Sequence, residues 1–135
     1  MELPLVVVDA ANTVGSVPDG WWRDRRGATE RLRDALAALA AVGLPAREDV
    51  PAWASGAPLD VLLVVEGAAR GVQPVDGVRV EAADGSGDDL IVELLAHAAR
   101  ETPGRPLLLI TADRQLRARA AALGARCAGP RAVRG

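Results

Sequence analysis

Short uninterrupted apolar runs alternate along this chain with longer stretches in which apolar residues recur every three or four positions. The runs are rich in valine, leucine and isoleucine and end at polar residues, which is typical of parallel strands buried on both faces. We predict a first strand that ends at Asp9 and further strands at residues 61–65, 78–81, 106–111 and 125–128.

The stretches with helical spacing predict amphipathic helices at residues 24–42, 88–100 and 114–123. Gly43 fits the end of the first helix, because glycine is common just beyond a helix C-terminus. Glycine and proline in residues 13–20 predict a loop there, and residues 44–59 are predicted as a long surface loop with little regular structure.

Strands that alternate with helices pair in parallel through right-handed crossovers. We therefore predict a three-layer α/β fold with a doubly wound parallel sheet of strand order 3-2-1-4-5. The length of 135 residues fits one domain, which we expect to span residues 1–135.

The composition and the lengths of the apolar runs predict where in the cell the protein is found. The longest apolar runs are far shorter than the roughly 20 residues that cross a bilayer, and Glu2 stands where a secretory signal would be basic. Cys127 is the only cysteine, so no internal disulfide can form. These features predict a cytoplasmic protein without membrane contact.

The residue types that are missing exclude several chemistries. All 16 basic residues are arginine, so neither a phosphate-loop lysine nor a Schiff base is available. A single histidine, His97, excludes a histidine-rich zinc site. The 18 carboxylates remain as the source of catalysis.

Carboxylates follow the predicted strands at the edge where ligands bind in α/β sheets. Asp9 ends the first strand, Asp113 follows the fourth, and Asp88 and Asp89 open the helix before it. The predicted strand order brings Asp9 and Asp113 side by side at the topological switch point. Clustered carboxylates repel one another unless a cation bridges them, and oxygen ligands select Mg²⁺ or Mn²⁺. Such an ion polarises phosphoryl oxygens and activates water.

Four segments, taken together, resemble the NYN branch of the PIN-like ribonucleases across residues 3–128. They are Asp-Ala-Ala-Asn at 9–12, Val-Val-Glu at 64–66, the helix start at 87–93 and Ile-Thr-Ala-Asp at 110–113. The resemblance implies a PIN-like fold and a divalent-metal-dependent ribonuclease.

The resemblance also assigns residues. It implies that Asp9, Asp89 and Asp113 bind the metal and that Asn12 steadies the first of them. Glu66 stands where the family pattern has an aspartate, and it would bind the metal or orient water. Either Asp88 or Asp89 could be the ligand. We favour Asp89, because Glu93 follows it at the family's spacing on one helical face.

Other interpretations of these residues stay open. An aspartate between a strand and a helix is a common N-cap, and Ser86 with Asp89 approximates a capping box. Tryptophan beside arginine predicts contacts with single-stranded RNA, although a hydrophobic staple and local ion pairs would explain the same residues. The candidate RNA contacts are Trp22, Arg23, Arg26, Arg114 and Arg117.

The sequence therefore favours a ribonuclease and leaves alternatives. One is a non-catalytic RNA- or nucleotide-binding module that has kept the fold. Another is a toxin-type PIN ribonuclease with a cognate antitoxin partner, which the small size permits, and a third is a phosphohydrolase of free nucleotides. A homodimer is compatible with each.

Overall fold

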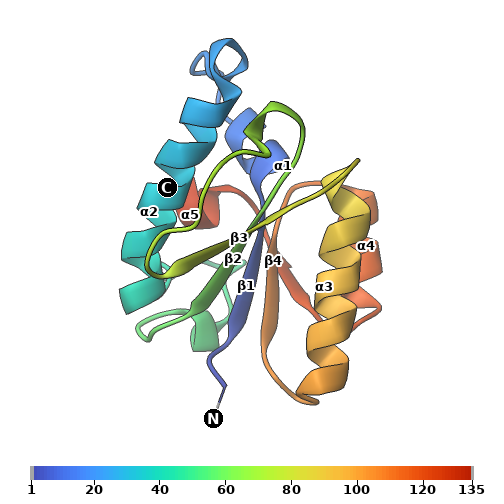
Figure 1. Cartoon of the computed structure of the whole chain (residues 1–135). Helices are drawn as coiled ribbons and strands as arrows, with labels where there is room; N and C mark the ends of the chain where they lie inside the picture. The colour runs from blue at the N-terminus through green and yellow to red at the C-terminus, as the bar shows by residue number, and fades with distance from the viewer. Residues whose placement is uncertain (1, 135) are drawn as a thin grey trace.

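Five parallel strands form one sheet in the order β3-β2-β1-β4-β5 in the computed structural model, which describes residues 2–134 (Figure 1). The strands are β1 (Leu5–Asp9), β2 (Asp60–Val65), β3 (Val78–Ala82), β4 (Leu107–Ile110) and β5 (Arg126–Ala128). The predicted sheet order is confirmed, including the pairing of β1 with both β2 and β4 at the switch point.

Helices cover both faces of this sheet, which makes the three predicted layers (Figure 1). Helices α1, α2 and α5 pack on one face, and α3 and α4 pack on the other. Their bounds are α1 (Ala10–Gly15), α2 (Arg25–Val42), α3 (Gly87–Glu101), α4 (Arg114–Ala121) and α5 (Arg131–Arg134). Short 3-10 turns are η1 (Trp21–Arg23), η2 (Ala52–Ala54) and η3 (Gly67–Ala69).

The continuous apolar run of β1 is explained by this covering. Val6 and Val8 pack into the core beneath α1 and α2, whereas Leu5 and Val7 pack beneath α3 and α4. Side chains of a strand alternate between the faces, so a strand covered on both sides needs apolar residues at every position.

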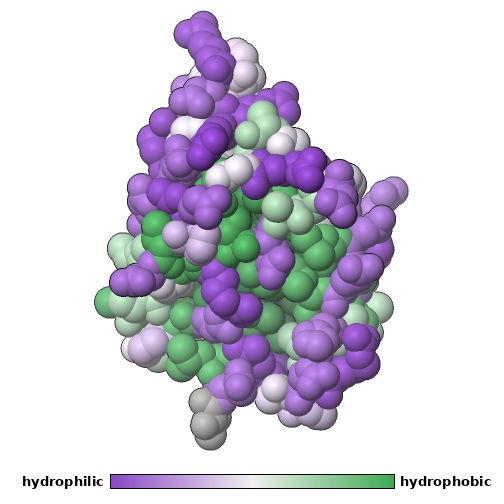
Figure 2. Space-filling model, in the orientation of Figure 1, coloured by the Kyte–Doolittle hydropathy of each residue, from purple (hydrophilic) through white to green (hydrophobic). Residues whose placement is uncertain are grey.

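Figure 2 shows a further apolar area on the surface between the polar residues of α2 and those of α3.

Two loop predictions are wrong in part. Residues 13–20 contain the end of α1, which begins directly after β1 because the Asp9 side chain caps it. Residues 44–59 are predicted as a surface loop, yet Leu44 and Leu59 are buried in the core and η2 lies between them. Elements this short leave no helical periodicity in the sequence, and α5 was missed for the same reason.

The structure bears on the prediction of no membrane contact only through its helices. Within residues 2–134, no helix combines the length and the apolar character that a bilayer span requires.

An ion-pair cluster links the amino ends of the strands, opposite the carboxyl ends where Asp9 lies. Asp60 at the start of β2 accepts hydrogen bonds from Arg79 and Arg105, each at 2.9 Å. Arg105 also donates to the carbonyl of Leu3 at 2.8 Å. Burial opposes the charge of Asp60, but the two arginines outweigh it and lower the pKa of this carboxyl.

We expect the substitution Asp60→Asn to lower the free energy of unfolding by about 1–2 kcal/mol at neutral pH, because it removes charge-assisted hydrogen bonds. Since the folded-state pKa of Asp60 is lowered, its contribution is present above the ordinary pKa of 3.8 and is lost as the pH falls below it. Denaturant unfolding at several pH values measures this loss. The exposed Asp84, which pairs with Arg70 at 3.6 Å, supplies the control Asp84→Asn. Equal effects of the two substitutions would contradict the expectation.

Candidate active site

Asp9 is the most buried acid at the carboxyl edge of the sheet, with 5% of its surface exposed. One of its oxygens accepts a hydrogen bond from the backbone N–H of Asn12 at 3.3 Å. The other accepts from the hydroxyl of Thr111 at 3.0 Å. The N-cap interpretation is therefore correct for Asp9, and the same contacts fix its carboxylate at the end of β1.

Thr111 joins the ends of the two central strands. It is fully buried, donates its hydroxyl to Asp9, and accepts a hydrogen bond from the backbone N–H of Asp113 at 3.2 Å. A hydroxyl is the side-chain group that donates and accepts at once with so little volume. Thr111 lies in the Ile-Thr-Ala-Asp segment, but the sequence pattern gave it no role, because a β-branched residue at the end of an apolar run is already explained as part of a strand.

Asn12 in α1 makes another link at the same edge of the sheet. Its side-chain oxygen accepts from the backbone N–H of Ala112 at 2.8 Å, which ties the start of α1 to the turn after β4. Asp113 in this turn caps α4 by accepting from the N–H of Leu116 at 3.0 Å. Asn12 thus contacts Asp9 through its backbone and positions the turn that carries Asp113 through its side chain.

Two further acids reach this region from other elements. Glu66 follows β2 directly, and Asp88 lies in the first turn of α3. Burial raises the pKa of Asp9, and the negative charges of Asp88 and Glu66 raise it further against the two hydrogen bonds that lower it. Burial also raises the pKa of Asp88, followed by the charge of Asp113. These four carboxylates therefore lie close enough to act on one another, at the switch point between β1 and β4 where α/β sheets form a ligand crevice.

Gly87 lets α3 begin beside Glu66. A side chain at this position would place its Cβ 3.2 Å from a carboxylate oxygen of Glu66, closer than ordinary contact distance. The absence of a side chain at residue 87 therefore brings the first turn of α3, with Asp88, against the end of β2.

Asp89 lies elsewhere. Its side chain is 81% exposed and pairs with Arg119 of α4 at 3.0 Å, which links the two helices on the surface. Glu93 and His97 on the same helix are exposed as well. The choice between Asp88 and Asp89 stays a prediction, and the contacts favour Asp88, because its charge acts on Asp9 and that of Asp113 acts on it, whereas Asp89 pairs with Arg119.

The donor chemistry of the crevice fits a hard divalent cation. Its side chains offer carboxylate oxygens alone, and a cation would relieve the repulsion that raises the pKa values of Asp9 and Asp88. Within the described part of the chain, however, no three acidic, histidine or cysteine side chains converge closely enough to form a ready set of ligands. An ion would have to draw the acids together.

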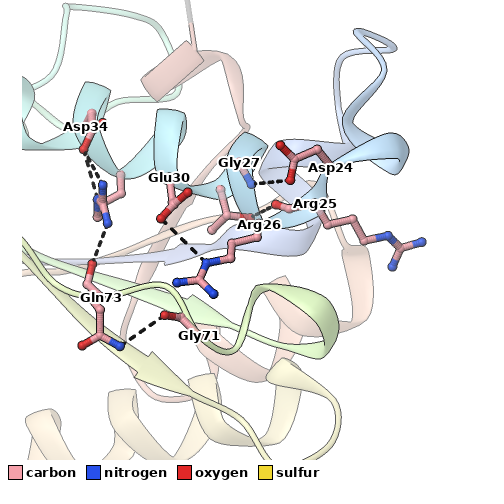
Figure 3. A network of polar contacts seen from close by, with 10 residues as sticks. Asp24, Arg25, Arg26, Gly27, Glu30, Asp34, Gly71 and Gln73 are labelled. Carbon is pink, nitrogen blue, oxygen red and sulfur yellow. Dashed lines mark hydrogen bonds and ion pairs between the residues drawn. The ribbon is translucent and has the colours of Figure 1, made fainter.

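The predicted RNA contacts lie in two separate segments, η1 with the start of α2, and α4. Trp22 is 52% exposed, and Arg23 and Arg114 are exposed. Arg26 pairs with Glu30 at 3.8 Å, and its guanidinium lies beside Gly71 after η3 (Figure 3). Arg117 donates to the carbonyl of Thr111 at 2.7 Å, so it supports the end of β4.

Trp21 and Arg25 lie beside Glu66, one acid of the crevice. Both line a cavity of about 210 Å³ that Glu66 also borders. The guanidinium of Arg25 lies 5.2 Å from the centre of the Trp21 ring, and Figure 3 shows this arginine extending away from Arg26 and Glu30. The pattern Trp-Trp-Arg-Asp-Arg-Arg signalled this segment, but it did not indicate which tryptophan turns inward.

Comparisons with known proteins agree with the fold. The PIN domain family model matches residues 58–131. The crystal structure of Rae1 (YacP) from Bacillus subtilis superposes with a TM-score of 0.67 at 19% identity, covering 96% of this chain and 71% of that one. A tryptophan-to-leucine mutant of Rae1 gives a TM-score of 0.65 at 17% identity, with 97% and 72% covered. At this identity the likeness shows a shared fold. None of the curated proteins matches the sequence.

Proposed function

Because the chain belongs to the PIN domain family, we propose that it is a divalent-metal-dependent ribonuclease that hydrolyses RNA phosphodiester bonds at its carboxylate crevice. The observation that carries this proposal is the electrostatic interaction of four acids from four elements at one edge of the sheet, where burial and mutual repulsion raise the pKa values of two of them. A crevice this rich in carboxylate suits Mg²⁺ or Mn²⁺. The NYN branch stays a prediction within the wider family.

Each residue of the crevice receives a role in this proposal. Asp9, Asp88 and Asp113 would hold the ion, which when bound supplies a Lewis acid for the phosphate and lowers the pKa of water. Glu66, half-buried directly after β2, would orient the attacking water. Asn12 and Thr111 position the acids through the hydrogen bonds that join the ends of β1 and β4.

Cleavage of end-labelled single-stranded RNA tests the function. Wild type should cut the RNA with Mg²⁺ or Mn²⁺ and stop when a chelator is added, and the variant Asp113→Ala should not cut it. RNA binding without cleavage, unchanged by chelator and by Asp113→Ala, would overturn the proposal in favour of the non-catalytic binding module.

Paired substitutions in α3 separate the two neighbouring acids. We expect Asp88→Asn to lower the rate of RNA cleavage about 100-fold or more, because it removes a carboxylate from the ion. Asp89→Asn should change the rate by less than about threefold, since it breaks an exposed ion pair with Arg119. Single-turnover cleavage rates at saturating Mn²⁺ measure both, and a larger loss in Asp89→Asn would restore the assignment made from the sequence.

The remaining expectations about the substrate, the partners and the cellular location stay predictions. They are single-stranded RNA as the substrate form, a homodimer, a cognate antitoxin and a cytoplasmic location.

A further inference from the structure

The cavity beside the carboxylate crevice is bounded by α1, η1, α2 and η3. Its volume is about 210 Å³. Small apolar residues such as Ala10 and Ala69 form one part of the wall, and the larger or polar side chains of Trp21, Arg25, Thr29 and Glu66 form the other. We propose that this cavity holds one nucleobase of the RNA strand, next to the phosphate that is cleaved; the second part of this inference rests on the proposed function.

The size of the cavity fits a single ring system. Pockets that enclose a drug-sized molecule usually span about 300–1,000 Å³, so this smaller space suits a base whose sugar and phosphate remain outside. Its walls offer what bases stack on, because Trp21 presents an aromatic ring and Arg25 a planar guanidinium 5.2 Å from the ring centre.

Thr29 adds a polar contact inside the cavity. It is 3% exposed, and its hydroxyl proton is donated to the carbonyl of Arg25 at 2.8 Å. The hydroxyl oxygen therefore keeps lone pairs that can accept a hydrogen bond from the edge of a base.

The position of the cavity links it to the acids. Ala10 in its wall follows Asp9 directly in the chain, and Glu66 borders the cavity while its charge raises the pKa of Asp9. A base in the cavity therefore brings its own phosphate to the carboxylate edge. Val42, at the other end of α2, is 63% exposed and does not line the cavity, so it provides the control.

Binding of a short single-stranded RNA, measured by fluorescence anisotropy with a chelator present, tests the base site without catalysis. We expect Trp21→Ala to weaken binding about 5- to 100-fold, the range that loss of one base stack produces, and Val42→Ala by less than about threefold. An abasic nucleotide at one position of the RNA should weaken binding to wild type similarly. That abasic penalty should disappear in Trp21→Ala, because the two changes remove the same contact.

A second variant guards against a loss of fold in Trp21→Ala. Ala11 is an exposed residue of the cavity wall, and Ala11→Leu should fill the space while it leaves the packing of Trp21 in place. It should weaken RNA binding and remove the abasic penalty in the same way. Unchanged binding in both Trp21→Ala and Ala11→Leu, or equal abasic penalties at every position in all proteins, would overturn the base site.

The base site and the proposed function fail in different ways. If wild type binds RNA with a Trp21-dependent abasic penalty but never cleaves it, the base site stands and the ribonuclease does not. If wild type cleaves RNA with Mn²⁺ while abasic substitutions have no effect on binding or rate, the ribonuclease stands and the base site is wrong.

Discussion

Asp9→Asn is expected to lower the rate of RNA cleavage about 1,000-fold or more while the fold stays at least as stable as wild type at neutral pH. The loss of activity follows because the most buried carboxylate of the crevice can no longer hold a cation that supplies several kcal/mol of stabilisation to the reacting phosphate. Asparagine is as good an N-cap as aspartate, so α1 keeps its cap. Cleavage rates and thermal unfolding measure the two effects, and Asp34→Asn on the exposed side of α2 is the control.

The stability change in Asp9→Asn should depend on pH. Burial, with the charges of Asp88 and Glu66, raises the pKa of Asp9 above its ordinary value of 3.8, so the folded protein holds this proton more tightly than the unfolded chain does. Stability therefore decreases as the pH rises above 3.8, where the unfolded chain has already lost the proton. The asparagine variant lacks this titration. Its advantage in melting temperature should be largest near neutral pH and vanish in acid, and a difference independent of pH would contradict this account.

Thr111→Val is expected to weaken both the fold and the site. Valine has almost the same shape but leaves the N–H of Asp113 and one oxygen of Asp9 without the partner they have at 3.2 and 3.0 Å. An unsatisfied buried group costs about 1–3 kcal/mol, and loss of a group that orients metal ligands typically costs 10- to 100-fold in activity or metal affinity. Denaturant unfolding and cleavage rates measure these losses.

The matched control for this position is Thr111→Ser. Serine keeps the hydroxyl and loses one methyl group, which costs roughly 1 kcal/mol at a buried position. It should therefore retain most of the cleavage activity. If serine and valine reduce cleavage equally, the hydroxyl of Thr111 does not position Asp9 and Asp113.

The sequence was sufficient to predict the sheet and the acids at its edge. The apolar run before Asp9 is uninterrupted because β1 is covered on both faces, and its end therefore marks the edge where parallel strands finish. Strand order then followed from the connections, and it placed Asp9 and Asp113 on neighbouring strands.

Choices between adjacent residues could not be made in the same way. Successive residues of a helix point about 100° apart, so whether Asp88 or Asp89 faces the crevice depends on how α3 is rotated against the sheet. The spacing from Asp89 to Glu93 describes one face of the helix without showing where that face points. The same holds for Trp21 and Trp22, which differ in exposure only through packing against the core.

Contacts between segments that are far apart in the sequence also could not be predicted. Thr111 and Asp9 are far apart in the chain, and their hydrogen bond exists because β1 and β4 are neighbours. The core residues of 44–59 were missed because the segment contacts the core at single positions such as Leu44 and Ala54, without a period that a sequence pattern would reveal.

Binding of Mn²⁺ to wild type and to Asp9→Asn, followed by electron paramagnetic resonance and compared with RNA cleavage at each Mn²⁺ concentration, tests the central claim most directly. If the crevice holds the catalytic ion, wild type binds Mn²⁺ and its cleavage rate rises with occupancy, while the variant loses both together. Equal Mn²⁺ binding by the two proteins, or RNA cleavage by wild type that persists in chelator, would contradict the assignment of the catalytic ion to these carboxylates.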